Sequence, residues 1–368
     1  MKGIYIYSSN DKDYKANGEA KKVLSQVKAF RKAGVEIVFL DVILDRKIDK
    51  VLYRMPFSGV YPWEFIKKCE NEVLDADFVF IRKNIFDGTY LKLLKAMKLA
   101  NPNLKIIVEI PTYPYFQEWN RIIDKPLIWK EKRVIPKVAT EKLVDYYLTL
   151  TDDKEIFGIP TIKFSNCISV EDYKPKKCLQ KADEVHLIGV ALLANWHGFD
   201  RLISGMKEYY QKTGGNSTKV VFHIVGDGPE LNNYKKTVDQ CKLNDYVIFE
   251  GKHKGEELDH FYDISNIGIG SLGMYRIGLE KATSLKLREY CAKGIPFIKA
   301  SDDEVFNDYE YCLSFSNDDE PIDISRIVSW SETIDYEKTA VSMREYATRN
   351  LDWGRYIQDI LKKIEEKT

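Results

Sequence analysis

Short apolar runs that alternate with longer amphipathic stretches constrain the fold of this chain more than any other feature. The apolar runs are rich in Val, Ile, Phe and Tyr, and helical spacing of apolar residues marks the stretches between them. Strands that alternate with helices form parallel sheets, because the return to the same edge needs a crossover helix. The sequence therefore predicts an α/β protein whose parallel sheets are covered by helices on both faces.

The pattern extends over both halves of the chain. The predicted strands are 3–7, 36–40, 78–81, 105–110, 147–150, 161–164, 185–190, 220–225, 247–249, 267–269 and 296–298. The predicted helices are 19–33, 90–99, 141–146, 199–210, 230–242, 256–262, 284–292 and 336–347. Residues 171–183 break the pattern with four lysines, one proline and little apolar content, so we place a linker there. A length of 368 residues also suggests two domains, which we predict as 1–170 and 171–350.

Composition argues against several classes of protein. The 56 basic and 56 acidic residues cancel, so net charge offers no support for nucleic-acid binding. No window approaches the roughly 18 apolar residues of a membrane-spanning helix, and residues 1–8 read as a first strand, not a signal peptide. The six cysteines are scattered without a C-x-x-C pair, which favours reduced thiols in a cytoplasmic protein.

The segment from Ser284 to Ile298 is the most informative part of the second half. It predicts a short amphipathic helix that ends at Gly294 and leads through Pro296 into a buried strand, with Glu289 in mid-helix. Free N–H groups and the positive dipole at a helix start favour a diphosphate. A carboxylate can accept hydrogen bonds from two neighbouring hydroxyls. An ordinary α/β crossover with an outward-facing Glu would have the same pattern.

This segment resembles the sugar-nucleotide-binding helix of family-4 glycosyltransferases, which are retaining group 1 enzymes with the GT-B fold. The resemblance implies two Rossmann-like parallel-sheet domains that face a cleft, with a C-terminal helix, residues 351–368, crossing back to the first domain. It implies that the second domain binds a nucleotide sugar, which we expect to be UDP-linked. The helix start (Ser284, Leu285 and Lys286) would then face the diphosphate, and Glu289 would bind the ribose hydroxyls.

Two glycines, Gly226 and Gly228, follow a predicted strand and resemble the family's Gly-x-Gly-Pro-x-Leu element, which faces the donor. Glycines let the backbone approach a ligand closely. Leu231 stands where the third glycine of G-x-G-x-x-G belongs, so dinucleotide binding is disfavoured. A tight strand-to-helix turn is the alternative.

The run Asn195-Trp-His197-Gly198 opens the first helix of the second domain. Family members usually have an Arg, and then a Lys before the Gly, that neutralise the diphosphate. Here Leu192 fills the place of the Arg and His197 that of the Lys. By resemblance, Asn195, His197 and Gly198 contact the donor, and His197 would donate hydrogen bonds to phosphate more strongly when protonated. A structural His is the alternative.

The missing positive charge is expected from Lys286 or Arg276. The family pattern E-x(7)-E also places a first Glu on the donor sugar's hydroxyls, and counting back from Glu289 gives Lys281, with Glu280 one place earlier. We expect Glu280 to lie near the sugar. The alternatives are a branch that lacks the first Glu, or a surface loop of mixed charge.

The first half is expected to bind the acceptor. Glu109, Thr112, Tyr113 and Tyr115 follow a buried strand, and ligands bind at the carboxyl ends of parallel strands. All five histidines lie after the linker, which excludes a Ser–His or Cys–His pair within the first domain. We therefore assign orientation of the acceptor hydroxyl to Glu109. A polar loop stiffened by prolines is the alternative.

Two more features bear on the acceptor. Asn17 and Gly18 resemble the glycine turn before the family's first helix, although an N-cap would look the same. Residues 121–142 contain seven Lys or Arg and three Asp or Glu, interleaved with apolar residues. Such a segment can contact anionic headgroups, and the family commonly works on lipid-linked acceptors at the inner membrane face. A solvated helix face is the alternative.

The resemblance implies transfer of a sugar from a UDP-sugar to the hydroxyl of a glycan, lipid-linked or protein-linked acceptor, with retention, in polysaccharide or glycoconjugate synthesis. No metal or other cofactor is expected, because Asp75 and Asp77 form a D-x-D string in the wrong domain and no His/Cys cluster has ligand spacing. We expect a cytoplasmic or peripheral membrane location. The alternatives are a UDP-sugar epimerase and a non-catalytic sugar-nucleotide-binding scaffold.

Overall fold

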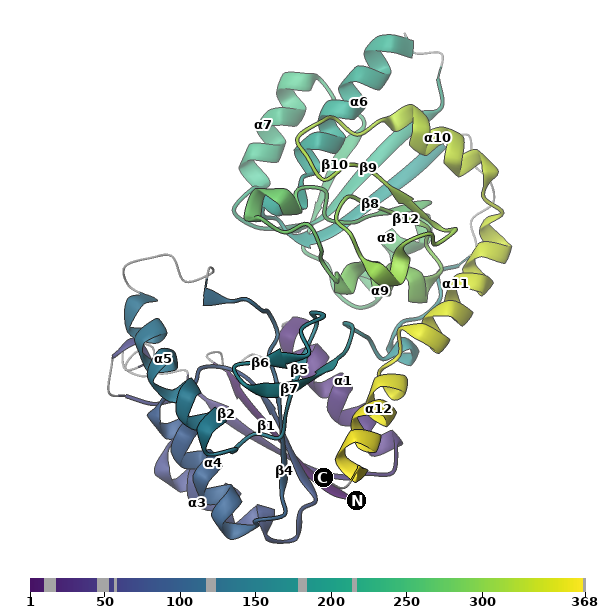
Figure 1. Cartoon of the computed structure of the whole chain (residues 1–368). Helices are drawn as coiled ribbons and strands as arrows, with labels where there is room; N and C mark the ends of the chain where they lie inside the picture. Colours follow the sequence, from purple (N-terminus) through teal and green to yellow (C-terminus); the bar gives the residue numbers. More distant parts are fainter. Residues whose placement is uncertain are drawn as a thin grey trace. The chain divides into compact units, whose positions relative to one another are not determined.

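The computed structural model describes residues 1–9, 18–44, 53–55, 58–116, 124–177, 184–213 and 217–366. The chain divides into two compact units: Met1–Ser165 with Trp353–Thr368, and Asn166–Asp352 (Figure 1). Each unit is built around its own sheet with helices on both faces. The predicted class, an α/β protein with two parallel-sheet domains, is therefore confirmed.

The first unit contains a seven-stranded sheet, counted in the described residues, with the order β2-β1-β3-β4-β5-β7-β6. All neighbouring strands are parallel except the β6–β7 hairpin. The strands are β1 (Lys2–Ser9), β2 (Glu36–Ile43), β3 (Phe78–Arg82), β4 (Lys105–Glu109), β5 (Tyr146–Thr149), β6 (Glu155–Ile156) and β7 (Ile159–Lys163). The helices are α1 (Gly18–Lys32), α3 (Trp63–Glu72), η2 (Val73–Asp75), α4 (Gly88–Ala100), α5 (Lys125–Thr140) and α12 (Trp353–Glu365).

Helices α3, α4 and α5 cover one face of this sheet, and α1 and α12 cover the other (Figure 1). A central strand covered on both faces is mostly apolar, and β3 is buried at every position, with the paired Arg82 at its end. That continuous burial explains why a plain apolar run predicted the strand.

The second unit contains a six-stranded sheet in its described residues, with the order β10-β9-β8-β11-β12-β13 and all pairs parallel. The strands are β8 (Glu184–Leu192), β9 (Lys219–Asp227), β10 (Val247–Gly251), β11 (Ile267–Ile269), β12 (Phe297–Lys299) and β13 (Cys312–Ser314). The α-helices are α6 (Phe199–Thr213), α7 (Leu231–Cys241), α8 (Glu256–Ile264), α9 (Leu285–Lys293), α10 (Ile324–Thr333) and α11 (Tyr336–Asn350). Short 3-10 turns are η5 (Val170–Asp172), η6 (Asn195–His197), η7 (Met274–Ile277) and η8 (Glu304–Phe306). Buried residues of α6, α7 and α10 form one core, and those of α8, α9 and α11 form the other.

One predicted helix is wrong. Residues 141–146 do not form a helix: α5 ends at Thr140, Lys142 takes a left-handed backbone with φ 50°, and Tyr146 begins β5. The helix in this region, α5, comes earlier and begins with Pro126 in its first turn, where the missing N–H is not needed. Helices α3 and α10 and strands β6 and β13 were not predicted.

The boundary between the units also differs from the prediction, since it follows Ser165 instead of residue 170. The expected linker, residues 171–183, is described as far as residue 177, and this part is tied to the second unit. Ile168 and Val170 are buried in the core formed with α9, and the Lys176 N–H donates to the Lys293 carbonyl at 2.9 Å. Local charge suggested a linker, but apolar residues just before it anchor the segment.

Helix α12 returns the chain to the first unit, as the fold prediction stated. Its buried residues, Trp353, Ile357, Ile360 and Ile364, recur with helical spacing. Trp353 stacks on Phe164, with ring centroids 6.1 Å apart. The side chain of Lys22 on α1 lies over the same tryptophan ring, at 5.7 Å from its centroid. The first unit is thus completed by the last helix of the chain.

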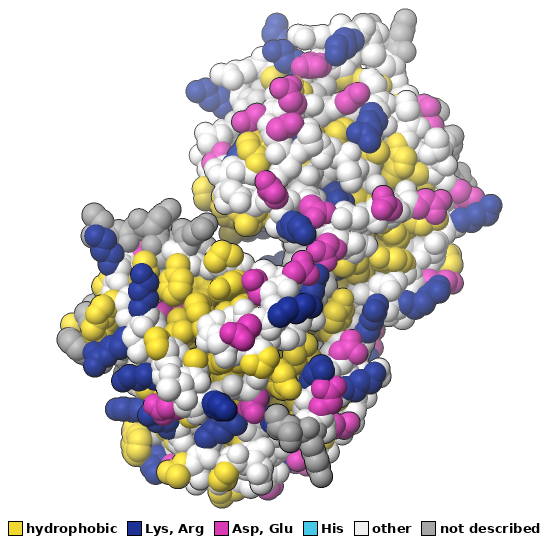
Figure 2. Space-filling view, viewed as in Figure 1, with side chains coloured by type: hydrophobic (Ala, Val, Ile, Leu, Met, Phe, Trp, Pro, Cys, Tyr) yellow, Lys and Arg dark blue, Asp and Glu magenta, His cyan; other side chains and the backbone are white. Residues whose placement is uncertain are grey.

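Basic and acidic side chains are interspersed over the face seen in Figure 2, in keeping with a net charge of zero. Among the helices of the described ranges, none has the length and apolar character needed to cross a membrane.

Candidate active site

Three neighbouring strands of the second unit end at one pocket. The pocket has a volume of about 240 Å³ and lies beside the start of α9. Its described lining residues follow the carboxyl ends of β8, β11 and β12, which are adjacent in the sheet: Trp196, His197, Ser271, Met274, Ala282, Thr283, Ser284, Lys286, Leu287, Lys299 and Ser301. The carboxyl edge of a parallel sheet is where ligands bind in open α/β proteins. We call this the donor pocket.

Helix α9 is held rigidly behind this pocket. Its inner side chains Leu287, Tyr290 and Cys291 are buried, and it ends at Gly294, whose φ of +74° forms a left-handed cap. At the other end, the N-cap Ser284 makes no side-chain capping hydrogen bond. The first N–H groups of the helix therefore lack the acceptor that such a side chain usually supplies.

Lys286, in the first turn of α9, is the unusual group of the pocket. Its Nζ is buried and has no hydrogen-bond partner in the described part of the chain. Burial lowers its pKa to about 7, against a smaller opposing effect of the nearby Glu289. Buried ammonium groups are costly without a partner, so this position favours an anionic ligand.

His197 also lines the donor pocket, and its ring is neutral there. Burial and the charge of Lys286 lower its pKa to about 3, so it is neutral at physiological pH. Its Nδ1 lies 3.1 Å from the Ala194 N and 3.2 Å from the Ala194 carbonyl oxygen, so it can accept from the first or donate to the second. In the tautomer whose Nδ1 accepts from the Ala194 N–H, the proton of the neutral ring is on Nε2, and His197 is a neutral hydrogen-bond donor.

Three glycines of the predicted donor site are required by packing of the backbone itself. Gly198 has φ +63°, and a Cβ there would lie 2.7 Å from the backbone N of Gly273. A Cβ on Gly226 would lie 1.9 Å from the Ala191 carbonyl oxygen, and one on Gly228 would lie 2.3 Å from that of Leu193. Gly226 and Gly228 therefore approach the chain at the end of β8, Gly198 approaches the segment that follows β11, and no ligand is needed to explain these contacts.

Arg276 is already paired and does not line the donor pocket. Its guanidinium makes two bonds to Asp200, of 2.8 and 2.7 Å, and contacts Asp319 at 3.0 Å and the Asn195 carbonyl at 3.0 Å. Hydrogen bonding to Asp200 raises its pKa. Arg276 fastens η7 to η6, so Lys286 is the better candidate for the missing positive charge. The exposed Asn195 contributes its carbonyl to this contact and is not among the pocket residues.

The remaining predicted donor residues lie around the pocket. Glu289 is half-buried, and its Oε1 accepts a hydrogen bond of 2.9 Å from the hydroxyl of Tyr173. Glu280 is exposed, and its carbonyl accepts from the Asp302 N–H at 2.8 Å. Leu285 packs against the α9 core. None of these three is among the described lining residues, whereas Ser284 and Lys286 are.

Glu109 was predicted to hold the acceptor, but it is shielded from solvent and cannot reach one. It is fully buried, with Lys22 at 2.7 Å, Arg82 at 2.6 Å and the amide of Gln26 at 2.9 Å. Burial alone would raise its pKa, but the charges of Lys22 and Arg82 outweigh it and lower the pKa to about 2. The carboxylate ties β4 to β3 and α1 inside the first unit.

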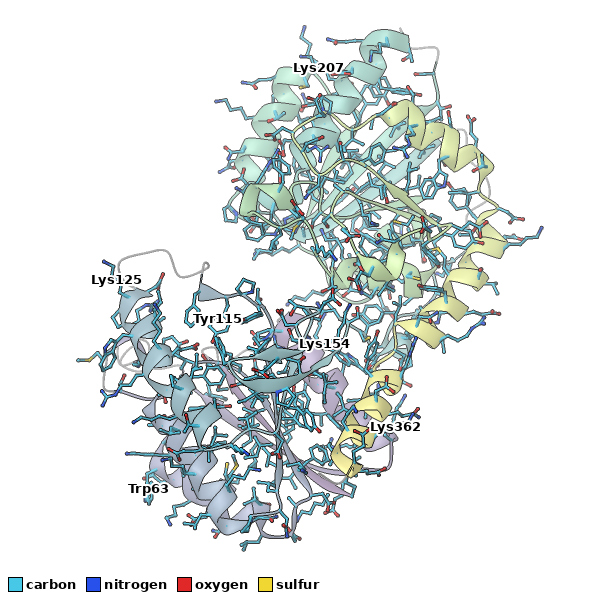
Figure 3. The ribbon with its side chains drawn as sticks, in the orientation of Figure 1. Trp63, Tyr115, Lys125, Lys154, Lys207 and Lys362 are labelled. Atoms are coloured by element: carbon cyan, nitrogen blue, oxygen red, sulfur yellow. The ribbon has the colours of Figure 1, made fainter. Side chains whose placement is uncertain are left out.

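The other predicted acceptor residues are divided. Tyr115 is buried, its hydroxyl donates to Glu131, and the Lys83 ammonium lies 3.8 Å from its ring centroid (Figure 3). Thr112 is exposed and Tyr113 is half-buried, so these two remain accessible. Gly18 begins α1, and Asn17 lies outside the described residues.

Sequence reasoning missed the buried pair of Lys83 and Glu131, whose charged atoms are 2.8 Å apart. No local signal marks it, because the two residues belong to segments far apart in the chain.

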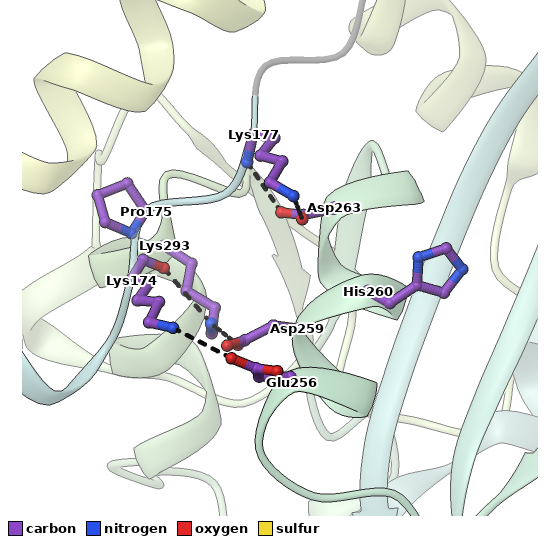
Figure 4. A pocket seen from close by; sticks show the side chains of 8 residues that line it. All are labelled: Lys174, Pro175, Lys177, Glu256, Asp259, His260, Asp263 and Lys293. Carbon is purple, nitrogen blue, oxygen red and sulfur yellow. Dashed lines mark hydrogen bonds and ion pairs between the residues drawn. The ribbon is translucent and has the colours of Figure 1, made fainter.

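A larger pocket of about 340 Å³ in the second unit is lined by lysines that already pair with carboxylates. Lys293 contacts Asp259 at 2.5 Å, Lys177 contacts Asp263 at 3.9 Å, and Lys174 contacts Glu256 at 3.9 Å (Figure 4). Its remaining described lining residues are Pro175 and His260. Because its cations have carboxylate partners, it offers no unmet charge to a ligand.

A metal site is not apparent in this arrangement. Within the described ranges, no group of three or more His, Cys, Asp or Glu side chains is placed to hold a metal ion.

The network of Glu109 yields a prediction about stability. Glu109→Gln removes the buried negative charge that Lys22 and Arg82 share, and we expect a loss of about 3–5 kcal/mol in the free energy of unfolding of the first unit. Because the folded-state pKa of Glu109 is depressed, its contribution is present above pH 4.5 and is lost as the pH falls towards 2. Urea unfolding at pH 7 and pH 3 measures both effects.

Glu19→Gln is the matched control, because Glu19 also pairs with Arg82, at 3.0 Å, but is half exposed. It should cost less than about 1 kcal/mol. Equal effects of the two substitutions would contradict the assignment of Glu109 to the core of the unit.

Comparison with known proteins bears on the donor pocket directly. Residues 171–320, which contain the pocket, match the family model described as glycosyl transferases group 1. A search of the curated proteins found no match.

The fold of the whole chain has well-matched relatives among solved structures. HepE of Anabaena, solved in complex with UDP-glucose, has a TM-score of 0.60 at 12% identity and covers 99% of this chain and 100% of its own. The lipopolysaccharide outer core galactosyltransferase WaaB in its apo form has a TM-score of 0.60 at 13% identity, with 100% of both chains covered. A trehalose-6-phosphate synthase, studied with bisubstrate glycomimetics for its glycosyl transfer with retention, has a TM-score of 0.61 at 10% identity, covering 100% of this chain and 99% of its own.

At these identities the likeness establishes the fold alone, which is the GT-B fold. The family match covers residues 171–320, which is less than half of the chain. The part of the second unit that contains the donor pocket therefore matches the group 1 glycosyl transferases, in a chain with the GT-B fold.

Proposed function

We propose that this glycosyltransferase moves a sugar from a UDP-linked donor to a hydroxyl of a glycan, lipid-linked or protein-linked acceptor, with retention of the anomeric configuration. The observation that carries the proposal is the buried Nζ of Lys286 in a pocket at the start of α9. It has no hydrogen-bond partner among the described residues, and the centroid of the Phe199 ring lies 5.6 Å from it. The UDP-glucose complex of HepE supports a UDP-linked donor. The trehalose-6-phosphate synthase of the same fold, which transfers its sugar with retention, supports the stereochemistry.

The donor diphosphate would lie against the first turn of α9. Lys286 supplies the positive charge, the uncapped N–H groups next to Ser284 donate hydrogen bonds, and the neutral ring of His197 donates one more. Binding of the anion raises the pKa of Lys286 and so fixes its charge. Glu289 would exchange its bond to Tyr173 for the ribose hydroxyls, and Glu280 would contact the donor sugar.

The chemistry follows from the leaving group that this pocket holds. The bond between the sugar's anomeric carbon and the phosphate oxygen breaks, and a bond to the acceptor oxygen forms on the same face of the sugar. The acceptor's proton passes to the leaving phosphate oxygen. Lys286 and the helix N–H groups stabilise the negative charge that develops on the diphosphate, so catalysis comes from positioning and electrostatics and requires no metal.

The acceptor would bind on the first unit. With Glu109 and Tyr115 buried, the accessible residues after β4 are Thr112 and Tyr113. We assign acceptor positioning to these two. The basic residues of α5 would allow contact with the anionic inner face of a membrane, where polysaccharide or glycoconjugate acceptors are assembled. Transfer of the sugar to an added acceptor would separate this proposal from an epimerase and from a non-catalytic scaffold.

The unpaired Lys286 yields a prediction with two opposite readouts. Lys286→Met should weaken UDP binding by about 1.5–3 kcal/mol, because it removes a charge-assisted hydrogen bond. It should leave stability unchanged or higher, since the buried charge that it removes has no hydrogen-bond partner in the described structure. The Phe199 ring, with its centroid 5.6 Å from the Nζ, offsets little of the cost of burying that charge. Calorimetric UDP titration and urea unfolding measure the two effects.

Lys293→Met is the matched control on the same helix, because Lys293 is also buried but is paired with Asp259 at 2.5 Å. This change should lower stability and leave UDP affinity unaltered. If Lys286→Met destabilised the fold and left UDP affinity intact, Lys286 would be a structural residue.

The depressed pKa of Lys286 predicts how UDP affinity depends on pH. Above pH 7 the side chain of the free protein is neutral and must take up a proton to bind the diphosphate. Affinity should therefore fall by about ten-fold per pH unit between pH 7.5 and 9. His197 is neutral over this range, because its pKa is about 3. The phosphates of UDP are fully ionised above roughly pH 7.

Lys286→Arg provides the control, because arginine stays charged throughout. This variant should bind UDP with nearly constant affinity from pH 7.5 to 9. A wild-type affinity that does not change with pH, or an equal slope in the arginine variant, would contradict the role of Lys286.

Metal independence and retention are tested on the reaction itself. We expect transfer to continue in excess EDTA, because charge on the leaving diphosphate is met by Lys286 and helix N–H groups. NMR of the product should give the anomeric configuration of the donor. Activity that EDTA abolishes and Mn²⁺ restores, or an inverted product, would be the contrary result.

A further inference from the structure

The first unit contains a pocket whose charges are not matched. It lies between α4 and α5 and has a volume of about 240 Å³. The described lining residues are Ser58, Gly88, Thr89, Leu91, Lys92, Trp129, Lys130, Arg133, Val134 and Lys137. Four of these are cationic, and none of those described is a carboxylate. We call it the α4–α5 pocket.

Helical spacing gathers three of the cations on one face. Lys130, Arg133 and Lys137 are separated by three and four residues along α5, so they project from the same side of the helix. Lys92 faces them from α4. Like charges on neighbouring positions repel one another, and a bound anion would relieve that repulsion.

The side chains of Lys92, Arg133 and Lys137 make no ion pair or hydrogen bond within the described ranges, and all three residues are exposed. Neighbouring lysines on α4 differ. Lys95 pairs with Glu141 at 2.8 Å, and Lys98 pairs with Asp145 at 2.8 Å. Carboxylate partners are thus present on nearby elements but do not reach the pocket.

The pocket also contains a buried charge that is held in place. Lys130 is only 3% exposed, and its Nζ donates to the Tyr53 carbonyl at 2.8 Å and to the Ser58 hydroxyl at 3.3 Å. An ammonium group has three N–H donors, so one more remains to be used. Trp129 lies at the edge, with the Arg133 guanidinium 5.3 Å from its ring centroid.

The first N–H groups of α4 are not the source of the anion site, because they already have an acceptor. The buried side chain of Asp87 accepts from the Thr89 and Tyr90 N–H groups, at 2.8 and 2.9 Å, and so caps the helix. Asp87 also places one negative charge beneath the pocket. Four side-chain cations exceed this single carboxylate, and the attraction for an anion comes from them.

We propose that the α4–α5 pocket binds a phosphate group, whether of free pyrophosphate or of a phospholipid headgroup. Arginine and lysine together match the geometry and charge of phosphate. Trp129, Leu91 and Val134 offer an apolar wall to the group that the phosphate carries. The headgroup form of this proposal rests on the membrane contact proposed above for α5. The pocket shares no described residue with the donor pocket, so the phosphate site and the donor site can fail separately.

Titration with inorganic pyrophosphate tests the site, with the donor pocket first saturated with UDP. Wild-type protein should show a saturable heat of binding. In Lys92→Ala/Lys137→Ala the affinity should fall by about ten-fold or more, since two charge-assisted contacts are removed. Lys95→Ala/Lys132→Ala removes two charges from the same two helices outside the pocket and should bind as the wild type does. Circular dichroism establishes that both variants are folded.

Sedimentation with vesicles separates the two sources of phosphate. The vesicles contain phosphatidylcholine alone or with 30% phosphatidylglycerol, about the range in which surface charge attracts basic segments. Pyrophosphate binding that only the pocket variant weakens supports a site for free phosphate. Binding to the anionic vesicles alone, weakened only by the pocket variant, supports a headgroup site. Binding to neither probe, or equal losses in both double variants, would overturn the proposal.

Discussion

One buried ammonium group without a hydrogen-bond partner among the described residues organises the functional half of this protein. The carboxyl ends of β8, β11 and β12 meet at the start of α9, and the first turn of that helix places the Nζ of Lys286 in the pocket that they enclose. The inner face of α9 is buried and the helix ends in a cap at Gly294. This packing fixes the position of Lys286 in the first turn. A folded protein tolerates such a charge when a ligand supplies the missing partner.

Several other buried charges contrast with Lys286, because they are paired. Glu109 is held by Lys22 and Arg82, and Lys83 is held by Glu131. Arg288 and Asp303, both fully buried, form a pair behind the donor pocket. Paired charges of this kind fix the arrangement of strands and helices, whereas an unpaired one is available for binding. Burial alone therefore does not identify a functional residue. An unmet hydrogen bond alone does not either, since the hydroxyls of Tyr90 and Tyr147 and the Nε1 of Trp353 also lack partners in the described structure. Lys286 differs because the group is an ammonium and lies at a pocket.

The sequence predicted the architecture well because buried parallel strands such as β3 are nearly continuous apolar runs. The regular spacing of apolar residues in a helix can likewise be read from a short stretch of sequence. It also named Lys286 and Ser284, since the start of α9 has a local pattern. It could not predict that Glu109 is enclosed, because Lys22 and Arg82 come from other segments and meet it only in the folded unit. Gly226 and Gly228 resembled ligand-facing glycines, yet the backbone they approach is that of the neighbouring strand. The sequence determines such contacts, but no local pattern displays them.

The most direct measurement is a structure of the protein with UDP bound. We expect a diphosphate oxygen within about 3.2 Å of the Nζ of Lys286, at the start of α9, with the ribose hydroxyls at Glu289. UDP bound elsewhere, or bound beside α9 while the Nζ of Lys286 still lacks a partner, would contradict the assignment of this pocket to the donor.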